Sequence, residues 1–398
     1  MMTLAKRLEK LGGETAFAVS LAAAAWAAKG NKVYPFHLGD INIPTAPNIM
    51  DAAYKAMHDG KNGYCPSAGI MPLRELLAND VGSRRGLSYS AENVAVQPGG
   101  KPVIGKFIQA VMNPGDEVLY PSPGYPIYES MIDYYGGVAK PYRYIETNKG
   151  FALDLDYLKA QITPKTKALI FNNCQNPLAA ESDRAEIEAV AEIAIQHNLT
   201  VLADDAYEQM RYSGKTEYIA NVPGMQERTV TLYTFSKKYA MTGWRLGAAI
   251  GPKPLIDAIA QLNVNDESCT AHFVQWAGVA ALTGDQSYEA QTLETLRQRR
   301  DAAVGILSNI KGIRVAKPES TFYLFPNVTE AMQRLGFEDV NEFATAALHN
   351  TNVSFCTRRH FGRSQPGEVQ QYVRFAYSGI DVENIQEGLT KLKEWIEE

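Results

Sequence analysis

The chain has 398 residues, of which 45% are hydrophobic, 21% charged and 10% aromatic, as in folded globular proteins. Its 39 Lys and Arg residues against 44 Asp and Glu residues give a net charge of -5, which is too small and too evenly spread to predict binding to nucleic acid or to an anionic membrane. Length and composition therefore exclude a disordered chain and favour two or three domains that act on small molecules.

The four cysteines lie far apart in the sequence and include no C-x-x-C pair. Their spacing predicts neither a zinc site nor a disulfide framework, so we expect no metal and reduced thiols, as in the cytoplasm. No run of about 18 apolar residues predicts a transmembrane helix.

An apolar run from Ala16 to Ala28 follows Lys6, Arg7 and Lys10, and this order is also that of a secretory signal peptide. The run is rich in alanine rather than leucine, and two glycines precede it. We therefore favour an amphipathic N-terminal helix over a signal peptide.

From residue 93 onward, short apolar runs alternate with helical patterns, which is typical of an α/β fold with a mainly parallel sheet. Between two of the runs, Ile187, Val190, Ala191, Ala194 and Ile195 recur at helical spacing and predict a crossover helix. The seven predicted strands of this sheet are 93–97, 117–120, 139–144, 167–172, 200–203, 229–234 and 246–250.

After about residue 285 the pattern changes to a long charged helix over 288–311, short strands over 322–325 and 372–377, and a final helix capped by Asp381. These elements predict a second, smaller α+β domain. We expect an N-terminal segment that joins the small domain, a large domain and a small C-terminal domain, with bounds 1–45, 46–285 and 286–398.

Polar residues follow the carboxyl ends of the predicted strands, where ligands bind in open parallel sheets. Gly99 and Gly100 begin a helix whose first amides suit a phosphate, although they form neither a Walker loop nor a dinucleotide fingerprint. Lys237 follows a buried run and is suited to attack a carbonyl, and Arg245 is expected to be partly desolvated and to grip a phosphate. Taken singly, these residues are also compatible with an ordinary turn, a solvated lysine and a structural ion pair.

Asp204 directly follows the predicted strand over 200–203, so we expect its carboxylate to be buried, and a buried carboxylate stays charged only beside a cation. A phosphate grip, an amine and a buried acid are the groups that pyridoxal 5'-phosphate needs: an anion site, a lysine for a Schiff base and a carboxylate for the pyridine nitrogen. Together they predict this cofactor.

The segment TFSKKYAMTGWRLG (residues 234–247) resembles the lysine signature of the class I/II aminotransferases, which are fold type I pyridoxal-phosphate enzymes. Further matches extend from Leu38-Gly39 to Tyr372-Val373-Arg374, so the resemblance covers nearly the whole chain. It implies the fold type I transferase fold, an obligate homodimer and amino transfer from an L-amino acid to a 2-oxo acid by ping-pong half-reactions. Aspartate or glutamate is the expected donor, as in bacterial aspartate aminotransferases.

The resemblance also implies a role for each matching residue. Lys237 forms the Schiff base and then moves a proton, and Asp204 pairs with the pyridine nitrogen. Tyr207 and Asn176 hydrogen-bond the phenolic oxygen of the ring. The other matches to the cofactor are Gly99, Gly100, Lys101, Tyr125, Thr234, Arg245 and, from the neighbouring subunit, Tyr64.

For the substrate, the resemblance implies that Arg374 clamps the α-carboxylate with help from Gly39 and Asn176. Lys101 resembles a lysine that binds the distal carboxylate in bacterial aspartate aminotransferases, but Ala16 stands where those enzymes have a threonine.

Two acids, Asp266 and Glu267, fall in a segment that usually contacts the partner's site. There they would repel a dicarboxylate, unless they lie in a solvated loop.

Leu178 and Ala179 also depart from the family, which commonly has Thr and Gly at these positions. The departures leave open another enzyme on the same scaffold: a β-lyase, decarboxylase, cyclase or oxidase of an amino acid. A cofactor-sensing regulator is disfavoured because Lys237, Asp204 and Arg374 are all present.

Overall fold

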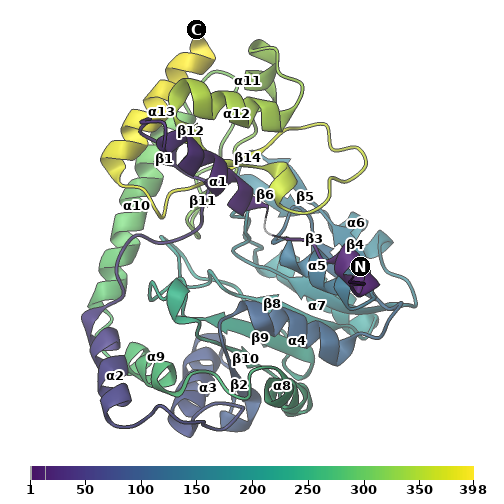
Figure 1. The fold of residues 1–398 in the computed structure, drawn as a ribbon. Coiled ribbons are helices and arrows are strands. Elements are labelled where there is room, and N and C mark those ends of the chain that lie inside the picture. Colours follow the sequence, from purple (N-terminus) through teal and green to yellow (C-terminus); the bar gives the residue numbers. More distant parts are fainter. Residues whose placement is uncertain (1, 14) are drawn as a thin grey trace.

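A seven-stranded sheet lies at the centre of the computed structural model, which describes residues 2–13 and 15–398 (Figure 1). Neighbouring strands pair in parallel except at β10, which is antiparallel to both β2 and β9. The predicted fold class and the seven predicted strands are confirmed. In spatial order the strands are β2 (Val94–Gln97), β10 (Gly247–Ile250), β9 (Thr229–Thr234), β8 (Thr200–Asp204), β7 (Thr166–Phe171), β3 (Glu117–Pro121) and β4 (Val138–Tyr142).

Helices cover both faces of this sheet, which is why its strands are continuous apolar runs. In β8, Leu202 packs with the helices of one face, while Val201 and Ala203 pack with those of the other. One face carries α4 (Lys101–Val111), α5 (Ile127–Tyr134) and α8 (Lys253–Asp266). The opposite face carries α2 (Pro47–His58), α3 (Met71–Arg85), α6 (Leu155–Ala160), α7 (Arg184–Gln196) and α9 (His272–Thr283).

The predicted crossover helix is α7, and its N-terminus is capped by Asp183, whose side chain accepts a hydrogen bond from the Glu186 amide. The predicted stripe is buried except at Ile195, which is exposed. Ile195 therefore lies at the edge of the buried stripe, beside the fully buried Ala194.

The C-terminal part of the chain packs α10 (Ser287–Leu307) and α13 (Val382–Glu397) against a three-stranded antiparallel sheet. Helix α10 extends from the helices beside the central sheet up to this part (Figure 1). Asp381 caps α13 as predicted, since it accepts a hydrogen bond from the Asn384 amide at 2.8 Å. The other elements here are β11 (Tyr323–Leu324), β14 (Val373–Ala376), β13 (Cys356–Thr357), α11 (Thr329–Arg334) and α12 (Val340–Thr351).

The N-terminal segment joins this C-terminal part, because β1 (Tyr34–Pro35) pairs in parallel with β12 (Val353–Ser354). The division into domains at residues 45 and 285 stays a prediction. Outside the two main sheets, β5 (Tyr144–Thr147) and β6 (Gly150–Leu153) form a hairpin that the sequence did not predict. Short 3-10 helices cover Lys6–Lys10, Ala91–Asn93, Ile219–Asn221, Gln226–Arg228, Thr242–Trp244 and Arg358–His360.

The N-terminal helix α1 (Ala16–Ala27) forms as predicted, but it is not amphipathic. Its apolar residues point in all directions, and Phe17 and Leu21 are exposed, while Ala23 is its buried residue. The expectation of one buried stripe was wrong because α1 lies on the surface of the C-terminal part rather than under it (Figure 1). Within residues 2–13 and 15–398, no helix combines the length and the apolarity needed to span a membrane.

Candidate active site

A cavity of about 700 Å³ lies at the carboxyl ends of the central strands, and the C-terminal part covers it with residues from β14 and the 3-10 helix over 358–360. The strands place their first polar residues at this edge, as expected for an open parallel sheet. The residues predicted for the site that line this cavity are Gly39, Gly100, Lys101, Tyr125, Asn176, Asp204, Tyr207, Thr234, Lys237, Arg245 and Arg374.

Asp204 is the last residue of β8, and its carboxylate is buried in the floor of the cavity. The hydroxyl of Tyr128 donates to its Oδ2 at 2.6 Å, and the Ala206 amide donates to its Oδ1 at 3.3 Å. Burial raises the pKa of Asp204 to about 6, although the hydrogen bond from Tyr128 opposes the shift. A cation placed beside this acid would keep it ionised. Tyr128, on α5, was not predicted.

A buried ion network holds the turn that carries Asp204 and Tyr207. Arg85 on α3 donates to Asp205 Oδ2 at 2.5 Å and to Glu208 Oε2 at 2.9 Å. These two acids directly follow Asp204 and Tyr207 in the sequence, so pinning them fixes the orientation of both site residues.

Tyr207 and Asn176 lie on the side of the cavity that faces the C-terminal part. The Tyr207 hydroxyl is 2.7 Å from the hydroxyl of Tyr323 on β11, and burial keeps the pKa of Tyr207 well above its usual value. Asn176 accepts a hydrogen bond from Arg374 Nη1 at 2.9 Å. Tyr207 and Asn176, the two residues predicted to contact the cofactor ring, are therefore hydrogen-bonded directly to the C-terminal part.

Lys237 follows β9, and its side chain reaches into the cavity. Its Nζ donates to the Gly39 carbonyl at 3.0 Å and lies 5.7 Å from the centre of the Tyr207 ring. Gly39 is required by packing, because a Cβ there would lie 2.2 Å from the Tyr323 hydroxyl. The amine is thus held beside a backbone carbonyl and aromatic rings.

An anion cradle lies where β2 leads into α4. Gly99 has φ +106°, and a Cβ on it would lie 2.2 Å from Arg245 Nη2, so only glycine allows the guanidinium to approach. Gly100 is the N-cap of α4, whose first amides lack intrahelical partners. The Thr234 hydroxyl lies 3.0 Å from the hydroxyl of Ser236, a residue not predicted for the site. Amides, two hydroxyls and a guanidinium therefore meet in one place.

The expectation that Arg245 is partly desolvated was wrong: its side chain lies on the rim of the cavity and is exposed. Its backbone adopts a left-handed conformation with φ 55°, and Nη1 donates to the Thr242 carbonyl at 2.7 Å. The end of a 3-10 helix, rather than an apolar strand, positions this side chain.

Arg374 is buried at the end of the cavity opposite the sheet. Its guanidinium carbon lies 4.5 Å from the centre of the Tyr323 ring and 4.6 Å from that of Phe361. Nη1 donates to Asn176, Nη2 donates to the His37 carbonyl at 2.8 Å, and Nε is buried without a hydrogen-bond partner. A carboxylate bound here would supply the missing acceptor.

Four residues singled out in the sequence do not line the cavity of their own chain: Gly99, Tyr64, Asp266 and Glu267. Tyr64 is 89% exposed and does not line it. Glu267 is not a solvated acid, because it pairs with the buried Lys106 through Oε2 at 2.7 Å, whereas Asp266 is exposed. Lys101 does line the cavity, and its Nζ lies 5.8 Å from the centre of the Tyr125 ring.

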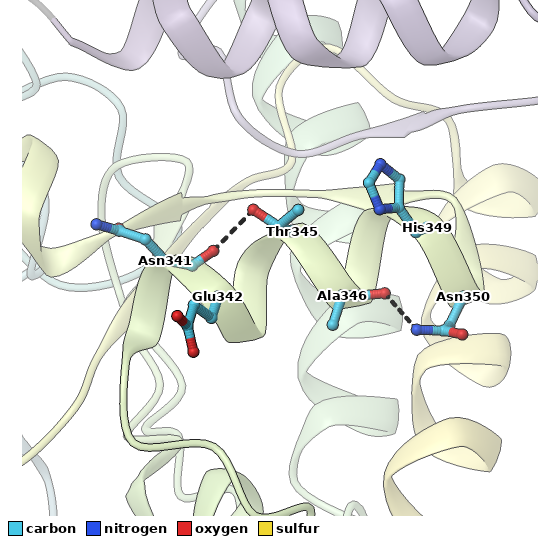
Figure 2. Close-up of a pocket in the computed structure, with 6 residues that line it drawn as sticks. All are labelled: Asn341, Glu342, Thr345, Ala346, His349 and Asn350. Atoms are coloured by element: carbon cyan, nitrogen blue, oxygen red, sulfur yellow. Dashed lines mark hydrogen bonds between the residues drawn. The ribbon is translucent and has the colours of Figure 1, made fainter.

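A second cavity, of about 500 Å³, lies on the surface of α12 with α1 across from it (Figure 2). Here the Thr345 hydroxyl and the Asn350 amide donate to carbonyls of their own helix, as the dashed lines show. Its walls, lined by residues of α12, contain none of the predicted site residues. We therefore place the chemistry in the larger cavity.

Comparisons with known proteins point to one family. Residues 32–392 match the family model described as aminotransferase class I and II. The chain is 34% identical to the aspartate aminotransferase of Geobacillus stearothermophilus over 91% of this chain and 92% of that protein. It is 30% identical to the asparagine–oxo-acid transaminase of Streptococcus mutans over 100% of both chains.

Solved structures agree with these sequence matches. The aspartate aminotransferase of Thermus thermophilus with maleate superposes with a TM-score of 0.90 at 29% identity, over 99% of this chain and 100% of that one. The alanine aminotransferase of Pyrococcus furiosus superposes with a TM-score of 0.91 at 28% identity, with the same coverage. The similar proteins thus share a fold and a reaction type while differing in the amino acid they are named for.

Proposed function

The chain belongs to the class I and II aminotransferases, and from this premise we propose that pyridoxal 5'-phosphate binds in the large cavity and that aspartate or glutamate is the amino donor. The enzyme moves an amino group from an L-amino acid to a 2-oxo acid. The observation that carries the proposal is that Lys237, Asp204 and Arg374 face one cavity although they come from distant parts of the chain.

The residues present are suited to this cofactor in three respects. Asp204 is a buried acid whose pKa burial raises to about 6, so that it gains from a neighbouring cation. The cradle at Gly99 and Gly100 has no room for a Cβ and offers amides and hydroxyls to a phosphate. Arg374 has a buried Nε without an acceptor, which suits the carboxylate of an amino acid.

When bound, the cofactor supplies an electron sink for the electrons of the bond broken at the substrate α-carbon. Arg374 holds the substrate carboxylate with its planar fork, and its packing between two rings fixes the angle at which the substrate enters. Lys237 Nζ would move the proton at the substrate α-carbon. Asp204 would hold a positively charged ring nitrogen of the cofactor, and the Tyr207 hydroxyl would donate a hydrogen bond to the cofactor.

The choice of donor rests on Lys101, which lines the cavity and resembles the lysine that binds the distal carboxylate in bacterial aspartate aminotransferases. Glu267 does not oppose this choice in its own chain, because the Lys106 ammonium neutralises it.

We further propose a cytoplasmic homodimer in which Tyr64 of each chain reaches the phosphate bound by the other. Tyr64 is exposed, and α2 presents an exposed apolar stripe nearby in sequence at Met50, Tyr54 and Met57. The four cysteines are free thiols, which is in keeping with a reducing compartment. In the proposed division, residues 46–285 form the large domain and the remaining segments form the small one.

The test is a half-reaction. The holoenzyme is mixed with single L-amino acids without an oxo acid, and the absorbance of the bound cofactor and the released products are followed. We expect aspartate or glutamate to bleach the absorbance with release of the matching 2-oxo acid, and an added oxo acid to restore it.

Lys237→Ala should show neither the absorbance of the lysine-bound cofactor nor turnover. Release of ammonia, carbon dioxide or peroxide in place of the 2-oxo acid would overturn the proposal.

A further inference from the structure

A cluster of polar side chains lies beside the turn from β2 into α4, and none of its members lines the large cavity. It consists of the buried Gln97, Lys106 and Asn263 together with the half-buried Glu267. Lys106 is only 2% exposed, and its Nζ donates to Glu267 Oε2 at 2.7 Å. A buried charge destabilises the fold unless it is paired, and the cluster supplies the partner.

Asn263, on α8, uses every hydrogen-bonding position of its side chain. Its Nδ2 donates to the carbonyls of Ser67 at 2.8 Å and Val96 at 3.1 Å. Its Oδ1 accepts from Gln97 Nε2 and from Lys106 Nζ, both at 2.8 Å. A side-chain amide has two donor hydrogens and two acceptor lone pairs, so all four hydrogen bonds of this group are made inside the protein.

The partners of Asn263 belong to the two segments that carry the predicted phosphate contacts. Val96 and Gln97 end β2, directly before the glycines of the anion cradle, and Lys106 lies on α4, which begins at that cradle. Ser67 lies three residues after Tyr64, in the loop between α2 and α3 (residues 59–70), which we call the Tyr64 loop. One amide therefore joins the strand and the helix on either side of the cradle to the Tyr64 loop.

We propose that Asn263 is a positioning residue for the cofactor phosphate: by bonding Ser67 and Val96 at once, it sets the position of Tyr64 relative to the anion cradle. The inference rests on the proposed function, which supplies the cofactor and the dimer. In that dimer the cradle of a chain serves its own phosphate and its Tyr64 serves the neighbouring one. Asn263 thus acts on the phosphate contacts of both sites without touching the cofactor.

Asn263→Asp breaks this link and keeps the rest of the cluster. The aspartate has nearly the same size, and its carboxylate still accepts from Gln97 and Lys106. It has no hydrogen to donate, so its second oxygen faces the carbonyls of Ser67 and Val96 and repels them. We expect the Tyr64 loop to shift away from the cradle in this variant.

A second variant and a control accompany it. Asn263→Ser is neutral, and its single donor hydrogen cannot hold two carbonyls, so the result does not depend on the folding of Asn263→Asp. The control is Asn265→Asp on the same helix, whose exposed side chain donates to the Gln261 carbonyl. Gln275 still accepts from the Ile70 amide at 2.8 Å in all variants and helps to keep the Tyr64 loop folded.

The first measurement is a fluorescence titration of the apoprotein with pyridoxal 5'-phosphate and with pyridoxal, which has the same ring and aldehyde but no phosphate. We expect both Asn263 variants to weaken binding of pyridoxal 5'-phosphate about tenfold or more, as for the loss of a hydrogen bond to a charged group. Binding of pyridoxal should change less than about threefold, and Asn265→Asp should change neither affinity. Equal losses for the two ligands, or unchanged affinity for pyridoxal 5'-phosphate, would overturn the inference.

The second measurement asks whether Asn263 acts through Tyr64. Tyr64→Phe, which removes the hydroxyl proposed to contact the phosphate, is combined with Asn263→Asp in a double-mutant cycle. If the loop has already moved, Tyr64→Phe should weaken binding of pyridoxal 5'-phosphate less than about threefold in the Asn263→Asp background, against about tenfold in the wild type. Additive losses would overturn the inference, whereas a wild-type apoprotein that binds neither pyridoxal 5'-phosphate nor pyridoxal would refute the proposed function itself.

Discussion

Arg374 is held in place by two aromatic rings and by its hydrogen bonds to Asn176 and the His37 carbonyl. A lysine at this position would keep the charge but lose the planar fork and the stacking. We expect Arg374→Lys to lower kcat/KM for the amino donor about a hundredfold, while the absorbance of the bound cofactor stays as in the wild type. Steady-state kinetics and an absorbance spectrum check this.

The control for that substitution is Arg334→Lys, on the exposed end of α11. It should leave both the kinetics and the spectrum unchanged. If Arg374→Lys lost cofactor absorbance to the same extent as activity, the arginine would belong to the cofactor site and not to the substrate site.

The burial of Asp204 makes the stability of the apoprotein depend on pH. Its pKa is raised from 3.8 to about 6 in the folded state. The contribution of the protonated acid is therefore fully present below about pH 4 and is lost as pH rises through about 6. Relative to Asp204→Asn, we expect the wild-type apoprotein to lose about 1 kcal/mol of unfolding free energy between pH 5 and pH 7.

Urea unfolding of both apoproteins at the two pH values measures this difference. Asp204→Asn is the matched control because an amide does not titrate. A wild-type apoprotein that gains stability relative to Asp204→Asn over this range would show that the acid stays ionised in the empty cavity.

The turn between β2 and α4 shows how an element boundary determines a binding site. Gly99 has a positive φ, and its missing Cβ leaves the space that Arg245 Nη2 occupies. We expect Gly99→Ala to push the guanidinium away and to weaken cofactor binding at least tenfold, since both backbone strain and a displaced cation oppose it. Fluorescence titration of the apoprotein with the cofactor measures the change.

Gly305→Ala is the control for this substitution, because a Cβ at Gly305, within α10, meets nothing within 4 Å. It should leave cofactor affinity unchanged and stabilise the helix slightly. Equal cofactor affinity in Gly99→Ala and the wild type would show that Arg245 does not contact the phosphate.

Most of the central strands could be predicted because they are apolar runs buried on both faces, whereas the edge strand β4 is exposed or half-buried up to Tyr142. The β5–β6 hairpin could not be predicted. The residues of β5 alternate between exposed and half-buried positions, and β5 begins at Tyr144, the last residue of the predicted strand over 139–144. The two-residue strands β1, β12 and β13 are too short to show a period, whereas β11 lies within the predicted strand over 322–325. Their pairing is decided by contacts between distant parts of the chain.

The same limit applies to the site. Lys237 and Arg245 lie in the segment 234–247, which resembles the family's lysine signature. The structure brings both residues to the cavity. Tyr128, Tyr323 and His360 carry no such signal: each becomes part of the site through a neighbour far away in sequence or through the fold of its own loop. The site residues that could not be predicted are therefore those that the folded chain, and not a sequence motif, brings to the cavity.

The proposed dimer depends on exposed apolar residues on the surface of the molecule. Met50, Tyr54 and Met57 make an exposed apolar stripe on α2, and Tyr64 follows it at 89% exposure. We expect Tyr54→Asp to convert the dimer to a monomer and to weaken cofactor binding, because Tyr64 then no longer reaches the neighbouring site. Light scattering after gel filtration and cofactor titration test the two effects.

Tyr64→Phe separates the contact from the assembly. It should leave the dimer intact and weaken cofactor binding about tenfold through loss of one hydrogen bond to a phosphate. Ile195→Asp, at an exposed apolar position on α7, is the control and should leave assembly and affinity unchanged. A wild-type protein that is monomeric and binds the cofactor tightly would contradict both expectations.

The position of Arg374 on β14, close to the C-terminus, means that the site becomes complete in two stages as the chain is synthesised. By residue 250 the ribosome has made all seven central strands and the residues around Lys237 that face the cofactor, whereas the substrate clamp still lies more than a hundred residues ahead. A nascent chain released early would therefore hold the cofactor-facing residues without the means to select an amino acid. The part of the cavity around Arg374 is thus the last part of the site to be synthesised.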